Sequence, residues 1–183
     1  MSHSVFRDRL IALASGASGD PTGFLDGLSD IHDDWHGENV RTYGFLTFHH
    51  RVVRYFKSIV NSSLAPPIAA YTAAELTALG VTPYGGNLAN VDTLGELRTL
   101  ATSIENWHNT AHMTLGAATG APMMDARVNI FYRPFWQLHF YIEDMFLLAL
   151  NQYGNRNHPG SFLNVNAVAS HIEAGHHSWV RSI

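Results

Sequence analysis

Two histidine-bearing segments carry most of the information about the fold: IENWHNTAHMTLG at residues 104–116 and RPFWQLHFYIEDMF at residues 133–146. His108 and His112 are four residues apart, so in a helix they lie about 40° apart on one face and can direct both imidazoles at one position. A second helix through His139, packed against the first, could supply a third nitrogen. Three imidazoles with no carboxylate or thiolate suit zinc or copper.

Histidine spacing alone is weak evidence for a metal site in this chain. The sequence contains 12 histidines among 183 residues, and chance predicts roughly one pair at i, i+4. A second such pair, His32 and His36, is present. The residues that flank the histidines therefore carry more of the argument than the spacing does.

The composition indicates one globular domain covering residues 1–183. Hydrophobic residues make up 46% of the chain and charged residues 14%, which gives enough apolar area for a core. The net charge is −4 with neutral histidines, and no basic run is present, so we expect neither nucleic acid nor a membrane as a partner. Cysteine is absent, which excludes disulfides and thiolate metal ligands.

Hydrophobic spacing predicts an all-α fold, a helical bundle around the histidines with long irregular loops. Thr93 and Glu96 form a capping-box pattern for a helix toward Ile104, with or without a break before His108. Loops are expected at 81–92, 116–125 and 155–160, and the other helices at 5–14, 24–35, 45–60, 71–79, 134–152 and 165–179. Without a long apolar run or a signal pattern at its start, the chain is expected to be cytoplasmic or exported with a carrier protein.

The flanking residues resemble the second copper-binding half of the tyrosinase family, the type 3 copper proteins. In that family, the sequence of this half begins with His-Asn-x-x-His, followed by a small Gly-rich turn. It continues with Pro-x-Phe-Trp-Leu-His-His and an Asp four residues after the last His. The matching residues are His108-Asn109, His112, Leu115-Gly116, Phe135-Trp136 and His139.

The chain departs from the family pattern at several positions in this half. Leu138 replaces the first His of the family's pair, Glu143 stands where Asp is usual, and Arg133 precedes Pro134 where the family favours Asp. One residue is also missing after Pro134. His139 keeps its spacing to Glu143, so the ligand position is retained, while the loss at Leu138 suggests a specialised substrate.

The first copper-binding half of the family is matched less closely. Phe45-Leu46-Thr47-Phe48-His49 resembles the family's Phe-Leu-Pro-Trp-His, with an additional His50 before Arg51. In a helix His49 and His50 point about 100° apart, so both are not expected to serve one copper. The spacing from Phe45 favours His49, and His50 remains an alternative if it aligns with Arg51.

The remaining ligands of the first half lie upstream in this resemblance. His32 matches the family's ligand on an earlier helix, and His36 is the one histidine between His32 and His49. His36 is therefore the candidate for the family's loop ligand, although its spacing to both neighbours differs from the family's. Whether His36 or His50 completes the first site stays open at this point.

The resemblance implies an oxidase with two copper ions held by His32, His36, His49, His108, His112 and His139. Such an enzyme uses O₂ to oxidise phenols, catechols or o-aminophenols to o-quinone-type products. Asn109 and Glu105 would hold a water that takes the phenol proton, although Glu105 could equally be a plain surface residue. Tyr141 would lie near the mouth of the pocket. A copper-delivery partner protein is also compatible with the resemblance.

Two non-catalytic alternatives share part of this ligand set. One is a reversible O₂-binding protein of the haemocyanin kind, and the other is a copper-binding protein with only the second site intact. A di-iron bundle is disfavoured because such a site takes Glu from several helices together with Glu-x-x-His pairs, and the sequence shows no such set. His158, His171, His176 and His177 have no motif around them and are expected to be solvated.

Overall fold

The computed structural model describes residues 29–30, 32–33, 36, 44–59, 64 and 66–157. All regular secondary structure within these ranges is helical, which confirms the all-α fold class for this part of the chain. Short stretches of helical backbone also carry Ser29, Asp30, His32, Asp33 and His36. The elements are α3 (Gly44–Ile59), α4 (Ala73–Ala78), α5 (Leu94–Thr119), the 3₁₀ helix η2 (Asn129–Phe131) and α6 (Arg133–Asn157).

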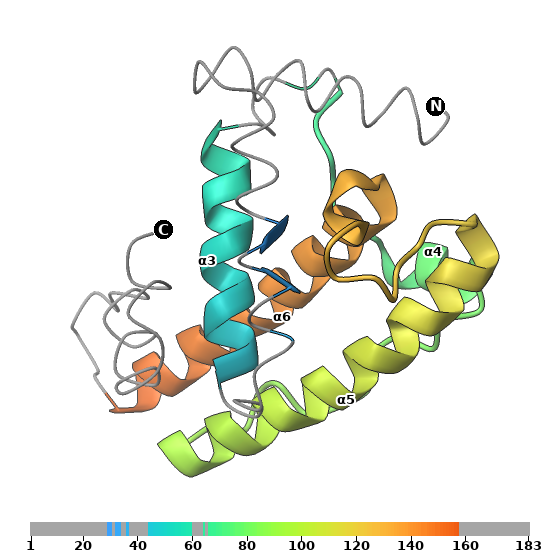
Figure 1. The fold of residues 1–183 in the computed structure, drawn as a ribbon. Coiled ribbons are helices and arrows are strands. Elements are labelled where there is room, and N and C mark those ends of the chain that lie inside the picture. Colours follow the sequence, from blue (N-terminus) through green and yellow to red (C-terminus); the bar gives the residue numbers. More distant parts are fainter. Residues whose placement is uncertain are drawn as a thin grey trace.

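The three long helices α3, α5 and α6 pack on one another (Figure 1). Helix α6 contacts both of the others, and its first turns also pack against η2. Trp136 anchors this packing, since its ring stacks on Phe56 at 3.6 Å between centroids and its Nε1–H donates to the Ile130 carbonyl at 2.7 Å. Both aromatic side chains are fully buried, so α3 and α6 are fixed relative to each other close to the histidines.

Helix α5 begins where the sequence predicts. Thr93 is its N-cap: the Thr93 side chain accepts from the Glu96 N–H, and the Glu96 carboxylate accepts from the Thr93 N–H. The helix then continues through His108 without a break and ends at Gly120, whose φ of 71° is left-handed, a conformation that glycine adopts without strain. The prediction of a loop from Gly116 was therefore wrong for residues 116–119.

Helix α6 is longer than predicted. It starts at Arg133 and runs through Asn157, so the loop expected from residue 155 does not include residues 155–157. Among the described residues, no helix is both long enough and apolar enough to cross a membrane. The helices predicted at 5–14 and 165–179 lie outside the described residues, as does most of the one predicted at 24–35.

Candidate metal centre

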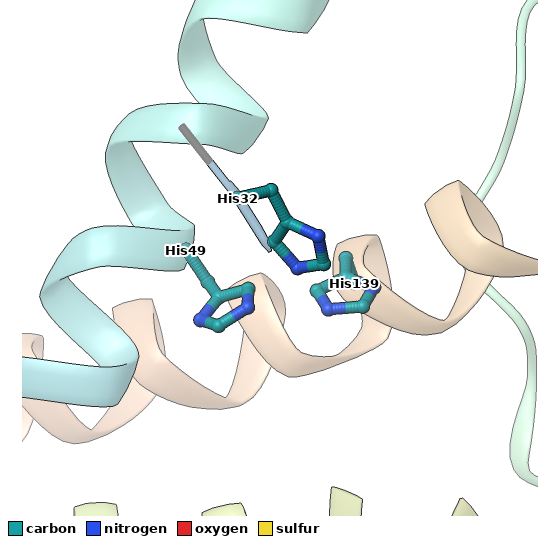
Figure 2. A group of neighbouring side chains, drawn as sticks. All are labelled: His32, His49 and His139. Carbon is teal, nitrogen blue, oxygen red and sulfur yellow. The ribbon is translucent and has the colours of Figure 1, made fainter. Parts of the chain in front are cut away.

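Six histidines from four parts of the chain meet between α3, α5 and α6, and we call them the histidine cluster: His32, His36, His49, His108, His112 and His139. Two triads within it could each hold a metal ion: the first triad, His32, His49 and His139, and the second triad, His108, His112 and His139. Within each triad, one nitrogen of every residue lies within 4.8 Å of the others. Figure 2 shows the three rings of the first triad pointing toward one another.

Two of these histidines are oriented by their own helices. The Nδ1 of His49 lies 2.7 Å from the carbonyl oxygen of Phe45, and the Nδ1 of His139 lies 2.8 Å from that of Phe135. In both cases the partner is the carbonyl four residues earlier. The Phe135 ring also stacks on His139 at 3.9 Å between centroids, so packing and hydrogen bonding fix the imidazole together.

The loop at residues 120–128, between α5 and η2, orients one histidine of each triad. Its Ala126 carbonyl lies 2.8 Å from Nδ1 of His32, and its Met123 carbonyl lies 2.5 Å from Nδ1 of His112. The buried Asn129 side chain donates to the same Met123 carbonyl at 3.1 Å. A single loop therefore holds two ligand candidates that lie 80 residues apart in the sequence, His32 and His112.

These hydrogen bonds determine which ring nitrogen is available to a metal. A carbonyl oxygen can only accept, so the four Nδ1 atoms carry the hydrogens and the Nε2 atoms keep their lone pairs. His108 follows the same rule, with Nδ1 lying 3.3 Å from Oδ1 of Asn109. Metal-ligating histidines almost always donate their other N–H to an oxygen in this way. Nε2 of His112 is buried with no hydrogen-bond partner in the described part of the chain.

The distances between Nε2 atoms fit coordination by a metal ion. His36 and His32 approach to 3.1 Å, and His108 and His139 to 3.2 Å, each measured between Nε2 atoms. Two imidazole nitrogens bound to one tetrahedral metal at about 2.0–2.1 Å lie roughly 3.3 Å apart. Pairs of Nε2 atoms at the spacing of metal ligands therefore occur both at His32 and His36 and at His108 and His139.

Electrostatics favour neutral imidazoles throughout the cluster. Burial lowers the pKa of His32 and that of His112 to about 4, despite the backbone hydrogen bonds that raise them. Burial, followed by repulsion from neighbouring imidazoles, lowers the pKa of His49, His108 and His139 well below 6.5. Neutral imidazole is the form that binds metals, so protons compete poorly for these nitrogens near neutral pH.

His36 is the least enclosed of the six histidines. Its side chain is half-buried, and its ring lies 4.6 Å from that of His32 and 5.6 Å from that of His49, centroid to centroid. It also faces His108 with nearly parallel rings, 6.3 Å apart. His36 therefore lies next to His32 and His49 of the first triad and faces His108 of the second triad.

The structure separates His49 from His50. His49 joins the first triad, whereas Nδ1 of His50 lies 2.7 and 2.9 Å from the two carboxylate oxygens of Glu143. Both members of this pair are buried, and the pair joins α3 to α6. The Glu143 carboxylate is thus bonded to His50, and Arg127 pairs with Asp33 at 3.3 Å.

A cavity of about 170 Å³ opens beside the second triad. Its walls are formed by His36, His108, Asn109, His112, Met123, Met124, Ala126 and Asn129. Of the two residues expected to assist chemistry, Asn109 lines this cavity, and Glu105 lies buried on α5 one turn before His108. Tyr141 is not among the described lining residues of this cavity, and its ring packs against Trp107.

Some features of the site were missed in the sequence. The Phe45–His49 and Phe135–His139 pairs share one spacing, Phe-x-x-x-His, and this repeat could have indicated the carbonyl that orients each ring. The contributions of Met123 and Ala126 come from backbone oxygens, which leave no signal in side-chain identity. His158, His171, His176 and His177 lie outside the described residues.

Comparison of the chain with protein-family models, with curated proteins and with solved structures finds no match.

Proposed function

We propose that this protein is a dinuclear copper oxidase that uses O₂ to oxidise small phenols, catechols or o-aminophenols to o-quinone-type products. The observation that carries the proposal is the histidine cluster itself. Two buried triads overlap at His139, and at least five imidazoles have Nδ1 bonded to an oxygen acceptor of the protein. The resemblance of the flanking residues to the tyrosinase family supports the same reading.

The donor set favours copper over most other metals. Both triads consist of histidines alone, whereas magnesium and calcium require oxygen ligands and di-iron bundles use several carboxylates. Imidazole suits copper and zinc, and copper adds the electron exchange with O₂ that zinc cannot perform. A copper pair, when bound, would supply that exchange, while the protein supplies orientation and access.

The ligands divide most simply into two sets of three. His139 belongs to both triads, but its Nδ1 is bonded to the Phe135 carbonyl, so its Nε2 can serve one ion. We assign His139 to the ion held by His108 and His112. The first ion is then held by His32, His49 and His36, whose Nε2 lies 3.1 Å from Nε2 of His32.

Protein side chains would manage the proton of the substrate. Asn109 lines the cavity and accepts a hydrogen bond from His108, so it can orient this ligand and face an incoming phenol at once. We assign to Asn109 and Glu105 the water that takes the phenol O–H proton. Two catechols each lose two electrons and two protons to become o-quinones, and one O₂ takes up the four electrons and four protons to give two waters.

A single-metal binding protein is the second candidate. The sharing of His139 between the triads favours it, because one ion bound to His139 in the second triad would leave only His32 and His49 of the first triad. Without a second ion next to the first, no coupled chemistry with O₂ would follow. A reversible O₂-binding protein would instead retain both ions and lack turnover.

Copper stoichiometry and oxygen uptake distinguish these functions. The full chain is loaded with copper, loosely bound metal is removed with a weak chelator, and copper per chain is measured. Two copper(II) ions that are silent in electron paramagnetic resonance, together with O₂ uptake driven by catechol, would support the oxidase. One EPR-visible copper would overturn it in favour of the single-metal protein, and two coupled ions without uptake would leave the O₂-binding protein.

A further inference from the structure

We infer that the cavity beside the second triad selects neutral aromatic molecules with a single ring, and that Met124 sets the size limit. The inference rests on the proposed function, because it takes this cavity to be the place where the substrate meets the histidine cluster. It adds what that function leaves open, namely the size and charge of the substrate.

The volume of the cavity sets the first limit. Its size is about 170 Å³, which is close to the ~150 Å³ of an engineered protein cavity that accommodates benzene. One aromatic ring with a hydroxyl and a small substituent fits this space. A fused second ring would require the walls to move.

The lining sets the second limit, which concerns charge. The described lining residues are three histidines, two asparagines, two methionines and one alanine, with no Asp, Glu, Lys or Arg among them. An amino-acid zwitterion would bring an ammonium and a carboxylate to walls whose described residues offer no counter-ion, and burying such unpaired charges is costly. A neutral phenol loses far less hydration and can contact the thioethers of Met123 and Met124, which interact favourably with aromatic rings.

Met124 both lines the cavity and is highly exposed to solvent. It is a lining residue whose side chain is 63% exposed, whereas the neighbouring Met123 is fully buried. A flexible side chain at an opening can restrict the width of what enters without closing the cavity. Met113 on α5 provides a matched control, since it is also 54% exposed and does not line the cavity.

Ligand binding to the zinc-loaded full chain tests this inference without turnover, because zinc fits imidazole ligands and is redox-inert. Dissociation constants are measured by ligand-observed NMR for 4-methylphenol, 2-naphthol and tyrosine. We expect 4-methylphenol to bind at least about tenfold tighter than either of the others, the scale on which pockets discriminate between ligands of different size. Met124→Ala should tighten 2-naphthol binding about tenfold and change 4-methylphenol binding by less than about threefold, and Met113→Ala should change neither.

Equal binding of 2-naphthol or tyrosine by the wild-type chain would overturn the inference, as would no binding of 4-methylphenol. Equal responses of Met124→Ala and Met113→Ala would overturn the role of Met124. Catechol-driven O₂ uptake by the copper-loaded chain tests the proposed function separately. Turnover with unselective binding would overturn the selectivity alone, whereas selective binding without turnover would overturn the oxidase alone.

Discussion

The two halves of the histidine cluster orient their imidazoles through the same kinds of contact, but their histidines lie on differently arranged backbone segments. Each half has a Phe-x-x-x-His pair, in which the phenylalanine carbonyl orients the imidazole, and each has one histidine held by a carbonyl of the loop 120–128. The second half places His108 and His112 on one continuous helix. The first half instead combines α3 with a separate stretch that carries His32 and His36.

This difference shows how much each site depends on tertiary structure. The geometry of His108 and His112 follows from the pitch of α5, so once the helix forms, two ligands are in place. In the first half, His32 reaches His49 only when its segment docks on the loop 120–128 through Ser29, His32 and Asp33. We therefore expect the second half to be the more robust metal site.

Substitution of the shared residue should have the largest effect. In His139→Gln, both triads lose their common member, so the second site keeps only two imidazoles and the first loses a neighbour. We expect catechol oxidation to fall to background, and the copper that resists a chelator wash to fall from two ions per chain to one or fewer. Atomic absorption and O₂ uptake measure the two effects. Retention of two tightly held ions would show that His139 ligates neither.

Substitutions of the neighbouring residues His49 and His50 on α3 should show which of them binds metal and which has a structural role. His49→Gln is expected to remove the first copper and retain the second with little loss of folding stability. His50→Leu should retain both coppers but leave Glu143 buried without its partner, which costs about 3 kcal/mol of unfolding free energy. Metal analysis and chemical denaturation distinguish them. Loss of copper in His50→Leu without loss of stability would reverse the assignment.

The sequence predicted the parts of the molecule that follow from local rules. The α5 capping box at Thr93 and Glu96 was correct because it involves residues three apart. The preference for His49 over His50 agrees with the structure because the spacing from Phe45 follows helical pitch. Placement of His32 and His36 beside α5 could not be obtained in this way, since it depends on long-range packing.

Three features of the structure differ from what local sequence patterns indicate, each for a physical reason. Helix α5 continues past Gly116 because alanines follow and Gly120 provides the left-handed end. The pairing of Glu143 with His50 was missed because the two residues are 93 positions apart. The loop 120–128 orients ligands through backbone carbonyls, so no pattern of side chains indicates its role.

Acidification should destabilise the metal-free chain through both halves. His32 in the first half and His112 in the second have pKa values lowered to about 4 from 6.5. Between these values the unfolded chain binds protons that the folded chain does not, so the unfolding free energy falls as the pH drops. Each such histidine contributes up to about 1.4 kcal/mol per pH unit within this window.

Denaturant unfolding of metal-free protein at intervals from pH 7.5 to about 4.5 measures this dependence. We expect a steeper loss below about pH 6.5 than above it, and a shallower loss in either His32→Gln or His112→Gln than in the wild type. If only one of these variants flattens the profile, the proton sensitivity belongs to that half alone. A profile without slope in this window would contradict burial of neutral imidazoles.

The smallest effects are expected where each half is anchored to the loop 120–128. Ser29 is buried and donates to the Arg127 carbonyl on the His32 side, and Asn129 donates to the Met123 carbonyl on the His112 side. Ser29→Ala should weaken metal binding at the first site, and Asn129→Leu at the second, each by about tenfold, the lower end for lost support of a ligand. Thr99→Ala, which removes an exposed hydroxyl bonded within α5, is the control.

Folding stability should separate from metal affinity in this comparison. Oδ1 of Asn129 is buried without a hydrogen-bond partner in the described part of the chain, so leucine removes an unfavourable buried acceptor together with the useful N–H donor. These two changes oppose each other, and we expect a net change in unfolding free energy below about 1.5 kcal/mol. Competitive zinc titration that resolves two binding events measures the affinities. If both variants weaken the same event, the loop orients the two halves as one unit, and the independence of the halves would be lost.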